Sequence, residues 1–169
     1  HKITFPTMET LNYFKRLNIT DPNKLELLYD PVIKVKSKKK KIKNNLTFKD
    51  YYLAIGRLTR QKNFLFLLKC FKILSKTNPN IKLIILGEGE QRPLLEKFII
   101  NNELKNNVLL PGYKIDVYKY LYNCKLFILS SLWEDPGFVM LEAMYARSLV
   151  LSSDCPSGPK EIVSKSEKR

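Results

Sequence analysis

The feature that most constrains the fold is a regular alternation of short apolar runs with longer amphipathic stretches, which begins near residue 50. The apolar runs are strand candidates bounded by turn residues or polar clusters, at 51–56, 81–87, 108–111, 125–130 and 148–152. The stretches between them have helical periodicity, at 62–76, 91–102, 116–122 and 138–146. This alternation predicts an α/β fold with a Rossmann-like, doubly wound parallel sheet.

The predicted strands are nearly all apolar, which is typical of strands covered by helices on both faces. In open parallel sheets, ligands bind outside the carboxyl ends of the strands. We therefore expect the chemistry of this chain in the loops that follow the strands, at 56–63, 87–90, 111–116, 130–137 and 152–159.

The first fifty residues do not follow this repeat. They predict a strand at 3–5, a helix at 8–17 and a second strand at 25–29, followed by a lysine-rich run. We interpret residues 1–48 as the end of an N-terminal domain with a basic linker, and 49–169 as a separate α/β domain. A chain of 169 residues is long enough for one such domain and too short for two.

The formal net charge of +14 predicts attraction to polyanions such as nucleic acid, anionic lipid or a diphosphate. Much of the charge lies in the run between Lys34 and Lys43. Two interpretations stay open: a solvated linker, or peripheral contact with the cytoplasmic face of an anionic inner membrane. No apolar run is long enough to span a bilayer and no signal peptide is visible, so we expect a cytoplasmic protein.

Cysteine and histidine usage excludes several kinds of site. The three cysteines, Cys70, Cys124 and Cys155, have no Cys-x-x-Cys spacing and indicate reduced, structural thiols. The only histidine is His1, which leaves no internal residue for a Ser-His-Asp triad or a histidine metal site. With no Asp-x-Asp pair either, we expect no metal and no cofactor.

The loops after the first two strands of the repeat carry cations and glycines. Arg57 follows Gly56 at a strand end and Lys62 stands at a helix start, a combination that suits a diphosphate but that also occurs as plain surface charge. Gly87 and Gly89 permit close approach of a ligand to the backbone, or simply a tight turn. They do not form the dinucleotide fingerprint, whose third glycine would fall on an arginine.

The loop at 130–137 is the most informative stretch. It places Glu134 in the loop, Gly137 at a helix start and Glu142 about one turn into that helix. Backbone N–H groups at the helix start would face an anion, and a helical carboxylate beside it can accept hydrogen bonds from vicinal hydroxyls. By pattern alone, Glu142 is equally well explained as an exposed helix residue.

Four motifs occur together in order: Gly56-Arg57-Leu58-x3-Lys62, Leu86-Gly87-x-Gly89, Leu110-Pro111-Gly112-Tyr113 and Glu134-x7-Glu142-Ala143-Met144. Their order and spacing resemble the glycogen-synthase-like and lipopolysaccharide- or capsule-type retaining glycosyltransferases, over roughly residues 50–163. The resemblance implies the C-terminal, donor-binding half of a GT-B fold, incomplete at both ends.

The resemblance also implies roles for individual residues. Arg57 and Lys62 would hold the donor diphosphate, Glu134 the donor sugar and Glu142 the ribose. The backbone near Gly112, Tyr113 and Lys114 would meet the base, and amides at Gly137, Phe138 and Val139 would complete the sugar and phosphate contacts. The glycines Gly56, Gly87 and Gly89 would line the donor site. The leaving phosphate would assist the acceptor, so no general base is required.

Departures from the family pattern narrow the expected function. Glu134-Asp135-Pro136-Gly137 replaces the usual Glu-Gly-Phe-Gly and resembles bacterial surface-polysaccharide enzymes, often with UDP-N-acetylhexosamine donors. The implied acceptor is a glycan or a lipid-linked sugar. Arg147 replaces a helix-ending glycine, so we expect a left-handed C-cap to be missing, and Ser157-Gly158-Pro159 replaces a Gly-Gly pair.

Two other classes remain as alternatives. A UDP-sugar epimerase of the same architecture would need its own catalytic acids and a histidine, and the chain has no internal histidine. A non-catalytic nucleotide- or nucleic-acid-binding fragment is supported by charge alone, without a recognition helix or stacking platform, so we expect no nucleic-acid partner.

Overall fold

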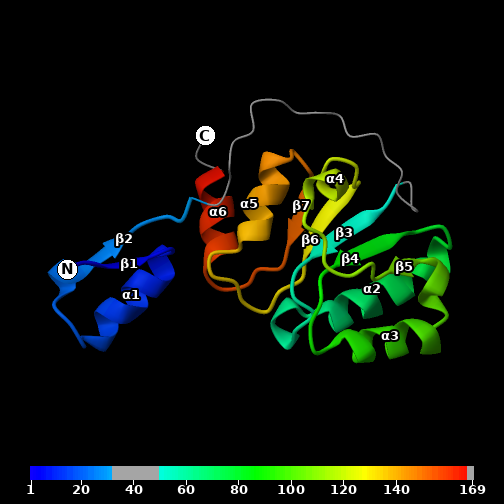
Figure 1. Cartoon of the computed structure of the whole chain (residues 1–169), viewed down its shortest axis with the longest axis horizontal. Helices are drawn as coiled ribbons and strands as arrows, with labels where there is room; N and C mark the ends of the chain where they lie inside the picture. The colour runs from blue at the N-terminus through cyan, green and yellow to red at the C-terminus, as the bar shows by residue number, and fades with distance from the viewer. Residues whose placement is uncertain (32–49, 167–169) are drawn as a thin grey trace.

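The computed structural model describes residues 1–31 and 50–166. The lysine run between Lys34 and Lys43 and the expected domain boundary near residue 49 lie outside the described residues. The described chain contains a two-stranded sheet in the order β1-β2 and a five-stranded sheet in the order β5-β4-β3-β6-β7 (Figure 1). All strand pairs in both sheets are parallel.

The N-terminal unit, residues 1–31, forms the smaller sheet. It consists of β1 (Ile3–Phe5), α1 (Met8–Leu17), the 3-10 turn η1 (Pro22–Lys24) and β2 (Leu25–Leu27). The α1 helix follows Thr7, whose hydroxyl accepts a hydrogen bond from the backbone N–H of Thr10 and so caps the helix. Three buried side chains form its own small core: Phe5, Leu11 and Leu25.

The larger unit, residues 50–166, alternates strands and helices as the sequence predicts. Its strands are β3 (Tyr52–Ile55), β4 (Leu83–Leu86), β5 (Val108–Leu109), β6 (Leu126–Leu129) and β7 (Val150–Ser152). Its helices are η2 (Arg60–Lys62), α2 (Phe64–Thr77), α3 (Arg92–Asn101), η3 (Leu104–Asn106), α4 (Tyr118–Leu121), α5 (Phe138–Tyr145) and α6 (Gly158–Ser166). The predicted parallel α/β fold is confirmed.

Helices cover both faces of the five-stranded sheet (Figure 1). Leu83 and Ile85 of β4 pack into the core under α2 and α3, whereas Ile84 and Leu86 pack into the core under α4 and α5. All four residues of β4 are buried, because its side chains alternate between the two faces and helices cover both of them. This two-sided burial explains why the strands are apolar without alternation.

The elements differ from the prediction mainly at their ends. Most strands are shorter than the apolar runs, because only the central residues form ladder hydrogen bonds. The α2 helix begins after Asn63, a left-handed residue that separates it from η2, and α6 was not predicted.

The expectation that the C-cap after α5 would be missing was wrong. Arg147 adopts the left-handed conformation itself, with φ of 60°, and its N–H donates to the Met144 carbonyl at 2.9 Å. Ser148 N–H donates to the Ala143 carbonyl at 3.0 Å. The left-handed cap at the end of α5 is therefore present, and Arg147 adopts a strained backbone conformation that glycine would adopt without strain.

Candidate functional site

The order in which the chain adds strands to the larger sheet switches sides between β3 and β6. From β3 the chain first proceeds to β4 and β5 on one side, and then returns to β6 and β7 on the other. The β3–β6 neighbourhood is therefore the switch point of the sheet, near which open parallel sheets bind ligands outside the carboxyl ends of their strands. Arg57 and Lys62 lie in the first of these loops, and Glu134 lies in the second.

Glycines let the loops after β3 and β4 pack backbone against backbone. Gly56 N–H donates to the Leu86 carbonyl at 3.0 Å, and Leu58 N–H donates to the Glu88 carbonyl at 2.8 Å. A Cβ on Gly87 would lie 1.9 Å from the Gly56 carbonyl oxygen, so no other residue fits there without a backbone shift. Gly89 is confined in the same way against the backbone of Leu58.

A hollow of about 340 Å³ opens above the ends of β3 and β4. It is lined by Ile55, Gly56, Arg57, Leu86, Gly87, Glu88, Tyr113, Lys114 and Val117. Five of the predicted donor-site residues thus share one hollow, although they come from three different loops. Arg57 is exposed at its rim, and Tyr113 is 71% exposed.

Lys62 and Glu134 form a nearly buried ion pair beside this hollow. The Lys62 Nζ lies 2.5 Å from the Glu134 Oε1, and the two side chains are 12% and 5% exposed. The buried Ser131 hydroxyl donates to the same carboxylate oxygen. The Lys62 side chain passes over Gly56, where a Cβ would lie 3.0 Å from the lysine Cε. Gly56 therefore provides the space that lets Lys62 reach Glu134.

Two further side chains, which the sequence reasoning missed, hold the β3 and β6 loops together. The Gln61 side-chain amide donates to the Trp133 carbonyl at 2.9 Å, and the Ser130 hydroxyl donates to the Lys62 carbonyl at 2.8 Å. Leu132 N–H also donates to the Gln61 carbonyl at 2.8 Å. Only the adjacency of Gln61 and Ser130 to quoted motif residues could have indicated them.

The α5 helix brings a half-buried carboxylate toward the same edge. Gly137, with φ of 87°, precedes the helix, so Phe138 and Val139 lie in its first turn, where backbone N–H groups have no partner within the helix. Glu142 follows one turn later, and burial raises the pKa of its carboxyl. The pKa of Tyr118 is raised mainly by burial of its phenol and next by the nearby negative charge of Glu142.

The predicted site residues therefore form three neighbouring groups. The hollow collects Gly56, Arg57, Gly87, Tyr113 and Lys114, and the ion pair joins Lys62 to Glu134. The third group is Gly137, Phe138, Val139 and Glu142 on α5. Gly89 and Gly112 act through packing: Gly89 lies against Leu58, and Gly112 accepts a hydrogen bond from Gly87 N–H at 3.1 Å. The sequence predicts that Arg57 and Lys62 converge on one anionic group, and the pairing of Lys62 with Glu134 was not predicted.

Within residues 1–31 and 50–166, no group of three or more His, Cys, Asp or Glu side chains is arranged to hold a metal ion. The same residues contain no helix with the length and hydropathy required to span a bilayer. Metal-independent chemistry stays a prediction.

A doubly wound parallel sheet with cations, carboxylates and a glycine-led helix start at its switch point defines a ligand-binding α/β domain. Residues 35–169 match the sequence profile of the family described as Glycosyl transferases group 1. The chain belongs to this family, and its fold is part of the GT-B glycosyltransferase fold.

Curated relatives agree with this assignment. The chain is 42% identical over 118 residues to an uncharacterized glycosyltransferase of Methanocaldococcus jannaschii, covering 69% of this chain and 29% of the relative. It is 31% identical over 142 residues to the N-acetylgalactosamine-N,N'-diacetylbacillosaminyl-diphospho-undecaprenol 4-alpha-N-acetylgalactosaminyltransferase of Campylobacter jejuni, covering 83% of this chain and 38% of the relative. The chain thus spans well under half of these proteins.

Solved structures show the same fold at low identity. TarM of S. aureus, in complex with UDP, Fondaparinux and alpha-GlcNAc-glycerol, superposes with a TM-score of 0.77 at 23% identity, over 95% of this chain and 31% of TarM. WaaG, a glycosyltransferase involved in lipopolysaccharide biosynthesis, superposes with a TM-score of 0.80 at 19% identity, over 96% of this chain and 47% of WaaG. These similarities show the fold alone.

Proposed function

We propose that the whole protein transfers a hexose or N-acetylhexosamine from a UDP-sugar, with retention, to a glycan or lipid-linked acceptor in bacterial surface-polysaccharide synthesis. The observation that supports this most is the meeting of Lys62 and Glu134 across the switch point of the sheet. A lysine and a carboxylate at this edge can serve a donor whose diphosphate is anionic and whose sugar offers hydroxyl groups. Family membership and the C. jejuni relative point to the same chemistry.

In this proposal, the hollow above β3 and β4 receives the nucleotide. Arg57 at its rim binds the diphosphate with its planar guanidinium, and the backbone at Gly112, Tyr113 and Lys114 meets the base. Glu142 on α5 accepts hydrogen bonds from the ribose hydroxyls. Binding would give this half-buried carboxylate partners, which offsets the burial that raises its pKa.

The sugar and its phosphate would lie toward the β6 loop. The first-turn N–H groups of Phe138 and Val139, after Gly137, are directed by the helix toward an anion or a sugar hydroxyl. Lys62 pairs with Glu134 at this position, and we infer that its ammonium group also contacts the donor diphosphate and stabilises the leaving UDP without a metal ion. The Glu134 carboxylate would accept a hydrogen bond from the donor sugar through its remaining lone pairs.

The placement of the chain in the whole protein is part of the same proposal. Residues 1–48 are assigned to the end of the acceptor-binding domain and a linker, and 49–169 to the donor domain. The separate sheet and core of residues 1–31 support this division. A cytoplasmic location, with the run between Lys34 and Lys43 against the inner membrane, would place the enzyme beside a lipid-linked acceptor.

The test uses the full-length protein with a panel of UDP-, GDP- and ADP-sugars in the presence of chelator. We expect turnover with a UDP-sugar to a lipid-linked or glycan acceptor, and a product with the anomeric configuration of the donor. Reversible loss of all activity in chelator would contradict the metal-independent mechanism. Donor hydrolysis or epimerisation without transfer to any acceptor would contradict the proposed function.

A further inference from the structure

Two helices from opposite ends of the described chain meet at their N-termini. The Glu161 carboxylate, in the first turn of α6, accepts hydrogen bonds from Met8 N–H at 3.1 Å and Glu9 N–H at 3.0 Å. The Glu9 carboxylate, in the first turn of α1, accepts one from Ser157 N–H at 2.6 Å. We call this reciprocal contact the Glu9–Glu161 clasp.

In the clasp, each carboxylate binds the N-terminus of the other helix and not that of its own helix. Glu9 and Glu161 are the acidic residues in the first turns of α1 and α6, where a glutamate ordinarily stabilises its own helix dipole. Here each carboxylate instead binds backbone N–H groups that have no partner within the facing helix. Hydrogen bonds to a charged acceptor are stronger than neutral ones, so the clasp fixes how the two helix ends face one another.

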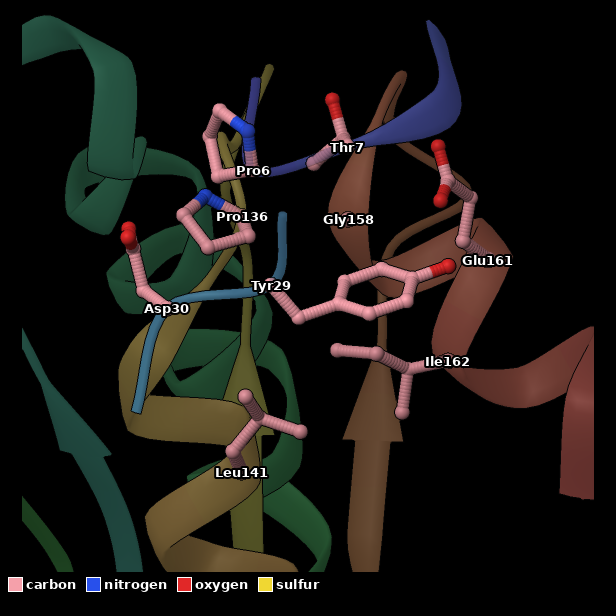
Figure 2. A pocket seen from close by; sticks show the side chains of 9 residues that line it. All are labelled: Pro6, Thr7, Tyr29, Asp30, Pro136, Leu141, Gly158, Glu161 and Ile162. Atoms are coloured by element: carbon pink, nitrogen blue, oxygen red, sulfur yellow. The ribbon is translucent and has the colours of Figure 1, made fainter. Parts of the chain in front are cut away.

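Apart from these hydrogen bonds, the two units meet around a hollow of about 340 Å³. Figure 2 shows its lining side chains, with Pro6, Thr7, Tyr29 and Asp30 from the N-terminal unit and Pro136, Leu141, Gly158, Glu161 and Ile162 from the larger unit. The hollow leaves part of the contact between the two units unfilled, and the hydrogen bonds of the clasp lie beside it, since Glu161 also lines it.

The clasp is in direct contact with the loop that carries Glu134. A Cβ on Gly158 would lie 1.6 Å from the Pro136 carbonyl oxygen, so the start of α6 rests on that loop. Glu134 N–H donates to the Pro156 carbonyl at 3.4 Å. The Thr7 side chain also lies near the Asp135 carboxyl and partly offsets the burial that raises the pKa of that group. The start of α6, which carries the clasp, is therefore joined to the Glu134 loop by packing and by a backbone hydrogen bond.

We propose that Glu9 and Glu161 are positioning residues for sugar transfer, which hold the N-terminal unit against the Glu134 loop. The inference rests on the proposed function, because it assumes that Glu134 serves the donor sugar. It assigns the clasp to the step in which donor and acceptor are aligned, and not to nucleotide binding, since neither carboxylate lines the nucleotide hollow. Orientation of this kind changes the rate of the chemical step.

The test compares Glu161→Gln, Glu161→Ala and Glu9→Gln in the full-length protein, with Glu26→Gln as the control. Glu26 is an exposed glutamate on β2 of the same unit, and among the residues that the structure describes its ion-pair partner is Lys2, at 3.9 Å. We expect kcat for transfer to fall about three- to tenfold in Glu161→Gln and Glu9→Gln, and further in Glu161→Ala, which removes both acceptor oxygens. The dissociation constant for UDP should stay within about twofold, and Glu26→Gln should match the wild type.

Hydrogen–deuterium exchange checks the contact without relying on activity. The amides of Met8 and Glu9 should exchange faster in Glu161→Ala, and that of Ser157 faster in Glu9→Gln, with the rest of the larger sheet unchanged. Unaltered kcat in all three clasp variants of an active enzyme would overturn the inference and leave the proposed function intact. Loss of UDP affinity in parallel with kcat would also overturn it, while a wild type that binds UDP but transfers no sugar would overturn both.

Discussion

The buried pair of Lys62 and Glu134 gives the sharpest quantitative prediction. Lys62→Met keeps the length of the side chain and removes its charge. Among the described residues, the Glu134 carboxylate, which is 5% exposed, then keeps the Ser131 hydroxyl as its side-chain donor. Removing one partner of a buried ion pair costs about 3–5 kcal/mol. Because the Lys62 side chain is 12% exposed and Ser131 still donates, we expect a loss of about 2–3 kcal/mol in unfolding free energy.

The matched variant Glu134→Gln should cost less, about 1–2 kcal/mol, because the carboxamide oxygen can still accept from Lys62 and Ser131. The double variant removes both charges and should recover about 1 kcal/mol or more of the summed losses. Urea unfolding of the 169-residue chain, followed by the fluorescence of its single tryptophan, Trp133, measures all four proteins. Losses that add within about 0.5 kcal/mol, or a Lys62→Met loss below about 1 kcal/mol, would refute an energetically coupled pair.

Three other substitutions test the site and its frame. Glu142→Gln should weaken UDP binding about tenfold or more by calorimetry, since the proposed function makes Glu142 the charged acceptor for the ribose hydroxyls. Burial raises the pKa of Glu142, so its ionisation makes the folded state less stable as pH rises through that pKa. Glu142→Gln should remove this loss, which would appear as a smaller fall in Tm with rising acidic pH and a slightly higher Tm at neutral pH. Arg147→Gly should stabilise the chain by about 0.5–1 kcal/mol in urea unfolding, because glycine adopts the φ of 60° without strain. Gly158→Ala should cost more than about 2 kcal/mol and slow transfer, because the new Cβ would meet the Pro136 carbonyl; an unchanged urea midpoint would contradict that contact.

The candidate site could be predicted in part because its residues follow predicted strands. Arg57, Lys62 and Glu134 stand just after strand ends, and parallel strands bring such loops to one edge. The hollow that joins Gly56, Arg57 and Lys114 confirms that the loops converge. The partners of each side chain could not be predicted, since several cations and carboxylates share that edge and the sequence does not rank their distances.

The N-terminal unit shows the same limit more strongly. The sequence predicts a strand, a helix and a strand before residue 30, and all three are present. It contains no signal that Glu161 would cap a helix that begins 153 residues earlier in the chain. Glutamate in the first turn of a helix is ordinarily explained by that helix alone, so the exchange of carboxylates between α1 and α6 had no local signature.

By itself, the sequence determined the α/β alternation, the two-sided burial of the strands and the edge at which chemistry would gather. These features depend on periodicity, turn residues and side-chain polarity, which act over a few residues. The tertiary structure alone decided the strand order, the pairing of Lys62 with Glu134 across 72 residues and the Glu9–Glu161 clasp. Such contacts depend on how whole elements pack, because a hydrogen bond forms or fails within a few tenths of an ångström, and no short-range pattern sets distances between elements to that precision.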